Sequence, residues 1–155
     1  MTRTASMKAD KKHHSLVDLD APPYVPDGWE VESHLPGSPI LGFGQHFDFY
    51  ISKAQQNGSI SGYELRSELA SMPVVNANVL DHLSRQLMMN PRSLSDYWKY
   101  DKLDRARHIF FWGTIYRYDG DLCVRSLHWN GYRWESSYGW LSSQWNSYYQ
   151  ALLHP

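Results

Sequence analysis

The sequence predicts an α+β fold in which short helices are followed by a C-terminal antiparallel β meander, and two patterns support this prediction. Apolar residues recur at helical spacing between about residues 62 and 99, whereas residues from about 106 to 150 are dense in aromatic and β-branched side chains. A length of 155 residues is typical of one domain. We therefore expect a mobile leader at residues 1–23 and a single α+β domain at residues 24–155.

Composition supports an ordered domain outside membranes. Hydrophobic residues make up 42% of the chain and charged residues 20%, which is an ordinary globular balance. The formal net charge of -1 gives no overall attraction to nucleic acid or anionic membranes. No stretch approaches the roughly 20 apolar residues of a membrane span, and the polar N-terminus lacks a secretory signal. We expect a soluble, cytoplasmic protein with no membrane partner and no nucleic-acid partner.

The first half of the domain contains the predicted helices. Residues 21–44 are rich in proline and glycine and are expected to form an extended crossing segment. Ser61 stands three residues before Glu64, the capping-box spacing, which predicts a helix over about 62–70 that Pro73 closes.

A second helix is predicted to start after Asn76, which is a favourable N-cap, and to run to about residue 89. Its apolar residues fall on one face: Val79, Leu80, Leu83, Leu87 and Met88. A further turn of helix is expected over Ser95–Lys99, with Trp98 facing inward.

Three strands are predicted beyond Ala106, at residues 108–118, 122–129 and 132–136, followed by a looser terminal segment. The first two are separated by an Asp-Gly pair. An Asn-Gly pair joins the second and third, and it predicts a type I′ hairpin because both central residues of that turn need positive φ.

No catalytic motif, cofactor-binding motif or metal-binding motif is found. Cys123 is the single cysteine, so neither an intramolecular disulfide nor a cysteine-based zinc cluster can form, and its place in a predicted strand favours a small buried hydrophobe over a nucleophile. Eight histidines include no His-Glu-x-x-His spacing. His108 and His128 can approach each other across the first hairpin, but we expect no metal there and no acid–base role.

The segment 128–149 is rich in Trp, Tyr, Ser and Asn, the mixture typical of binding loops. Its four tryptophans taken alone favour the core of a small β domain, whereas the hydroxyl and amide side chains between them favour a surface. The candidate ligand-binding residues are Asn130, Tyr132, Ser136, Ser137, Tyr138, Ser142, Ser143, Asn146, Tyr148 and Tyr149.

Three arginines suggest an alternative. Arg117, Arg125 and Arg133 stand beside tyrosines on successive predicted strands, and such a sheet can bind single-stranded nucleic acid by stacking and phosphate contact. The competing interpretation is an ordinary solvated face, since the net charge is near zero.

Two parts of the chain carry a family resemblance. The segments Leu65–Leu69 and Met72–Asp81 come first, followed by Ile109–Arg117, by Leu122–Arg125 and by a Trp-Leu pair at 140 and 141 with Trp145. Over about residues 24–153 this pattern resembles a family of short, uncharacterised bacterial proteins of uncultivated ultrasmall bacteria. Members keep the Phe-Trp-Gly-Thr-Ile strand and vary downstream, as do the variable proteins of diversity-generating retroelements. The resemblance implies a hypervariable C-terminal surface, and a C-type-lectin-like variant of the fold as an alternative.

We therefore expect a ligand-recognition module that presents an aromatic C-terminal surface to a protein, peptide or glycan. A structural or single-stranded nucleic-acid-associated protein is the alternative. An enzyme with no recognisable motif is the third interpretation.

Overall fold

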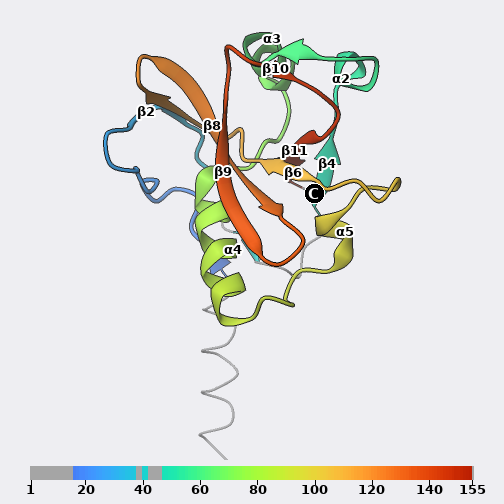
Figure 1. Cartoon of the computed structure of the whole chain (residues 1–155). Helices are drawn as coiled ribbons and strands as arrows, with labels where there is room; N and C mark the ends of the chain where they lie inside the picture. The colour runs from blue at the N-terminus through green and yellow to red at the C-terminus, as the bar shows by residue number, and fades with distance from the viewer. Residues whose placement is uncertain (1–15, 38–39, 42–46, 155) are drawn as a thin grey trace, which may run out of the picture.

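The structure, a computed structural model, describes residues 16–37, 40–41 and 47–154 and shows the mixed helix and strand composition that the sequence predicts (Figure 1). A curled, mostly antiparallel sheet dominates over four short helices among the described residues. Residues 1–15 of the expected mobile leader lie outside the described residues. Its remaining part is packed, because the side chains of Val17 and Leu19 are buried, so the ordered domain starts before residue 24.

The three predicted helices are confirmed. They are α3 (Gly62–Leu69), α4 (Ala77–Met89) and α5 (Asp96–Lys99). The side chains of Ser61 and Asn76 accept backbone N–H bonds at the starts of α3 and α4, as their cap positions predict. Helix α2 (Lys53–Gln56) was not predicted, since four residues are too short to show helical periodicity.

The main sheet has the strand order β2-β7-β8-β6-β11-β4, and β9 pairs with β8 outside this path. Its strands are β2 (Glu30–His34), β4 (Asp48–Tyr50), β6 (His108–Phe110), β7 (Thr114–Tyr118), β8 (Asp121–Trp129), β9 (Trp134–Trp140) and β11 (Tyr149–Leu153). Two small antiparallel pairs join β1 (Leu16–Val17) to β3 (Ile40–Leu41) and β5 (Ile60–Ser61) to β10 (Gln144–Trp145). Only the β6–β11 pair of the described strands is parallel.

The predicted single strand 108–118 is wrong, because a turn at Phe111–Gly113 divides it into β6 and β7. Both pieces still pair with β8, one with each half of that long strand. Gly113 lies against the start of α4, where an added Cβ would be 2.6 Å from the amide nitrogen of Asn76. The close approach of α4 therefore requires glycine at the break.

The hairpin at Asn130 forms, but its predicted two-residue turn is wrong. Strand β9 begins at Trp134 instead of Tyr132, and the loop is closed by the Asn130 N–H donating to the Arg133 carbonyl at 3.0 Å. The Asn130 side-chain oxygen also accepts from the amides of Tyr132 and Arg133, a local bond that competes with a tighter turn. Two consecutive positive φ angles, 49° and 80°, occur instead at Asp119 and Gly120, between β7 and β8.

The terminal segment expected to be loose contains β11, which lies inside the sheet between β6 and β4. Parallel pairing with β6 depends on a partner far away in the chain, so local patterns do not reveal it.

The core has two large parts, one on each face of the sheet, and a small third cluster that contains Ala77, Tyr116 and Cys123. Helix α4 packs against the face that carries Ile109 and Leu127, while α3 and the segment after β9 cover the face that carries Phe110 and Val124. Figure 1 shows α4 beside β8 and β9, with α2, α3 and β10 grouped at the other end of the molecule. None of the helices in the described ranges is long and apolar enough to cross a membrane.

Candidate ligand-binding groove

A groove with a cavity of about 290 Å³ lies on the face of the sheet opposite α4. It is formed by β6, β8, β9, β11 and the segment that follows β9. Its lining residues are His108, Phe110, Ser126, His128, Ser137, Tyr138, Gly139, Trp140, Ser143, Gln144, Trp145 and Tyr149. The lining therefore combines aromatic rings, imidazoles, hydroxyls and an amide.

The strand registers place four titratable side chains in one row across the groove face. Glu135 of β9 lies opposite His128 of β8, His128 lies opposite His108 of β6, and His108 lies opposite Tyr149 of β11. Directly opposed residues of neighbouring strands project from the same face. The next row on that face contains Ser137, which lies opposite the buried Ser126.

The two imidazoles are stacked, with ring centroids 4.7 Å apart and an interplanar angle of 23°. The Tyr149 ring meets the His108 ring edge-on at 5.5 Å. On the other side, the Glu135 carboxylate lies 3.7 Å from His128 Nε2. The Nδ1 atom of His128 is buried and has no hydrogen-bond partner among the described residues.

Burial lowers the pKa of His108, and the neighbouring His128 lowers it further. His108 is therefore neutral near pH 7, when an imidazole offers one hydrogen-bond donor and one acceptor. The groove's chemistry is thus best suited to hydrogen bonding and ring contact with a ligand.

Four of the ten candidate ligand-binding residues line this groove: Ser137, Tyr138, Ser143 and Tyr149. The Tyr138 ring itself packs on the opposite face of the sheet, edge-on to Trp29 at 5.0 Å and to Trp140 at 5.4 Å.

The other six candidates are spread over the hairpin and the following loop. Asn130 and the 91% exposed Tyr132 lie in the loop of the hairpin, and Ser136 projects from the α4 side of β9. Ser142 is hydrogen-bonded to Asp121, and Asn146 accepts from the Tyr148 amide. The sixth is Tyr148 itself, whose ring lies 5.1 Å from the Arg105 guanidinium. The ten residues therefore do not form one continuous surface.

Sequence reasoning missed Ser126 and Phe110 as groove residues, missed Glu135 as the neighbour of His128, and gave His108 and His128 no binding role. Alternation along β6 and β8 places His108 with Phe110, and Ser126 with His128, on one face. This signal was present in the sequence, but the register and the parallel β11 were needed to assemble the row.

The four tryptophans of segment 128–149 divide between the core and the surface interpretations. Trp145 is a core residue with 2% exposure, and its Nε1 donates to the Trp140 carbonyl at 2.9 Å. Trp129, Trp134 and Trp140 are half-buried. On the α4 face, Trp29, Tyr118 and Trp140 form successive stacked pairs with centroids 5.1 and 5.8 Å apart.

The three arginines behind the nucleic-acid alternative are each paired with a carboxylate. Arg117 is 3.2 Å from Glu32 and Arg133 is 3.2 Å from Glu135. Arg125 makes a two-point contact with Asp81 of α4 and is 11% exposed. Each arginine therefore has a carboxylate partner, and the nucleic-acid alternative stays a prediction.

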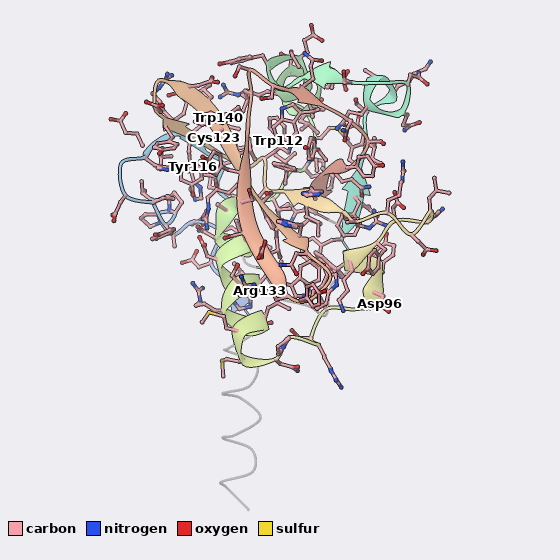
Figure 2. All side chains as sticks on the ribbon, in the orientation of Figure 1. Asp96, Trp112, Tyr116, Cys123, Arg133 and Trp140 are labelled. Atoms are coloured by element: carbon pink, nitrogen blue, oxygen red, sulfur yellow. The ribbon has the colours of Figure 1, made fainter. Side chains whose placement is uncertain are left out.

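The described residues contain no group of three or more His, Cys, Asp or Glu side chains arranged to hold a metal ion. Figure 2 shows Cys123 close to Tyr116 and Trp140, its neighbours on β7 and β9. Burial raises the pKa of the Cys123 thiol to about 12, so the nucleophilic thiolate is not populated near pH 7.

Comparison with known proteins does not identify a relative. No protein-family model matches the sequence, and neither a curated protein nor a solved structure matches it significantly. The function is therefore argued from the groove and the β8–β9 hairpin, and the C-type-lectin-like variant stays a prediction.

Proposed function

We propose that this protein is a ligand-recognition module in which the β8–β9 hairpin presents the binding surface to a protein, peptide or glycan. The observation that carries the proposal is the contrast between the two strands. Ser136, Ser137 and Tyr138 are consecutive and exposed on β9, whereas Val124 and Leu127 of β8 are buried. Adaptable polar side chains and a tyrosine are thus presented by a rigid scaffold, as in known binding surfaces.

The residues of the groove are suited to binding an uncharged group of the ligand. The residues that line the cavity include no Lys, Arg, Asp or Glu, and burial keeps His108 uncharged near neutral pH. Glu135, at the end of the same row, is paired with Arg133. Rings such as Phe110 and Tyr149 offer contact area, while Ser137 and Ser143 offer hydrogen bonds.

A binding screen tests the proposal with defined probes. The full-length protein would be applied to a glycan microarray and to a displayed library of random linear peptides. We expect binders whose affinity falls at least about tenfold with Tyr138→Ala, because hot-spot aromatics of interfaces contribute on that scale. Leu103→Ala is the control, since Leu103 is 72% exposed in the segment between α5 and β6 and lines no cavity beside the β8–β9 hairpin. Absence of binders in both screens, or equal losses in both variants, would contradict the proposal.

The proposed hypervariability has a genetic test. The 3′ end of the gene would be sequenced deeply from its source population, with attention to the codons for residues 128–149. Substitutions that cluster at adenine-derived positions, with residues 108–125 unchanged, would support a retroelement-diversified surface. An invariant segment would reject the hypervariability and leave a conventional aromatic surface.

A further inference from the structure

Strand β9 is the outermost strand on its side of the sheet. All seven of its residues pair with β8 in continuous register, from Trp134 opposite Trp129 to Trp140 opposite Cys123. None of the described strands pairs with its other edge.

Hydrogen bonds at the two ends of the ladder show which residues face that edge. The Asn130 amide donates to the Arg133 carbonyl at 3.0 Å, and the Leu141 amide donates to the Leu122 carbonyl at 2.9 Å. Bonded and non-bonded pairs alternate in an antiparallel ladder. The two end bonds make Asn130–Arg133 and Leu122–Leu141 bonded pairs. The odd-numbered residues of β9 therefore bond to β8, and the even-numbered residues direct their N–H and C=O groups outward.

The outward carbonyl at the end of β9 already accepts hydrogen bonds from within the chain. The Trp140 carbonyl accepts from the Ser143 amide at 3.2 Å and from the Trp145 ring nitrogen, which confirms the outward direction. The outward backbone groups of Trp134, Ser136 and Tyr138 have no partner among the described residues. Three residues therefore present a regular set of donors and acceptors along one line.

This edge lacks the usual protection against pairing with another chain. Natural edge strands are commonly blocked by proline, lysine or a β-bulge. Strand β9 contains neither proline nor lysine, and its ladder with β8 shows no register shift. Its one charged side chain, Glu135, is engaged by Arg133 and Asn130.

A cavity flanks β9 on each face of the sheet. The groove of about 290 Å³ lies on the His128 side, and a second cavity of about 320 Å³ lies on the α4 side. Leu87, Met88, Leu127 and Trp134 give the second cavity a mainly apolar lining. Each cavity is lined by a residue whose ring nitrogen has no hydrogen-bond partner among the described residues: His128 Nδ1 and Trp134 Nε1.

We infer that the outer edge of β9 binds an extended peptide segment of a partner protein by β-strand addition. The inference rests on the proposed recognition function and gives it a partner class. Successive side chains of an added strand point to opposite faces of the sheet. The fitting peptide therefore alternates an apolar side chain, placed in the cavity beside α4, with a polar or aromatic uncharged side chain, placed in the groove. Backbone bonds supply affinity, and the two cavities supply the sequence preference.

A scan of backbone methylation tests the pairing directly. Linear peptides selected from the displayed library would be synthesised with one N-methyl group at each position in turn. Methylation removes a donor, so binding is expected to weaken about tenfold or more at alternate positions and to change little at those between. Peptides that bind without this period of two, or a library that yields no peptide, would overturn the inference.

Two substitutions at one position test the protein side. Ser136→Pro removes an outward N–H, a replacement that edge strands tolerate, and should weaken peptide binding about tenfold. Ser136→Ala keeps the N–H and removes only the side-chain hydroxyl, so it should weaken peptide binding much less than Ser136→Pro does. If Ser136→Pro prevents folding, the methylation scan with wild-type protein still decides.

The remaining outcomes separate this inference from the general function. Ligands that lose affinity with Tyr138→Ala but are insensitive to backbone methylation and to Ser136→Pro would preserve the recognition function and overturn strand addition. A concentration-dependent dimer in sedimentation that Ser136→Pro abolishes would assign the edge to a second copy of this chain, which also overturns the peptide inference.

Discussion

Two regions rich in aromatic residues lie close together but are built differently. The buried junction, residues 110–113 with Trp145, packs rings against each other, with the Phe110 and Trp145 centroids 4.4 Å apart. The hairpin surface, residues 130–138, exposes its tyrosines and serines. Trp145 has its single ring donor satisfied inside the protein, whereas the Tyr132 ring is in solvent. Aromatic content alone therefore does not reveal which side chains are available to a ligand.

The largest expected difference between the regions is in stability. Trp145→Ala removes ring contacts with Phe110 and Trp112 and should lower the free energy of unfolding by about 3–5 kcal/mol. Tyr132→Ala, the control in the hairpin surface, should change it by less than about 0.5 kcal/mol. Urea denaturation of the two variants measures both values. Similar losses for the two would show that the hairpin surface is also structural.

Replacing one glycine in each region should give a second, smaller difference in stability. Gly113→Ala forces a Cβ to within 2.6 Å of the α4 backbone, so we expect a loss of about 3 kcal/mol. At Gly131, where φ is +100° and no atom lies within 4 Å of an added Cβ, alanine should cost only backbone strain of about 1 kcal/mol. Thermal melting of both variants ranks the two costs. An equal or reversed ranking would mean that α4 can shift away from the junction.

The smallest expected effect is a pH dependence centred on the groove between the two regions. The lowered pKa of His108 means that the unfolded chain, whose imidazole titrates near pH 6.5, binds more protons than the folded chain below that pH. Stability is thus complete above about pH 6.5 and declines as the pH falls through that value towards the lower folded pKa. His128, Glu135 and Tyr149 are the titratable groups in the same row.

Replacing His108 by glutamine tests this assignment. The slope of the melting temperature against pH between about 6.5 and 5 should become shallower in His108→Gln than in the wild type. Some slope should persist, because burial also lowers the pKa of His82 and His154. A slope identical to that of the wild type would place the proton uptake elsewhere.

Local signals in the sequence were sufficient for α3, α4 and α5 and for the hairpin's position. Ser61 and Asn76 cap α3 and α4 because a short polar side chain satisfies free amides wherever the helix lies. Within the candidate site, the exposure of Ser136, Ser137 and Tyr138 follows from polar side chains that an apolar core would leave without partners.

The tertiary structure decided the rest. The strand is divided at Gly113, where the chain meets the start of α4, and the non-local parallel pairing of β11 aligns Tyr149 with His108 in the groove. The sequence by itself determined α3, α4, α5 and the position and polar character of the β8–β9 hairpin, since these depend on neighbours within a few residues. It could not determine the groove or the free edge of β9, because both are defined by which strands pair, and pairing is set by the packing of segments far apart in the chain.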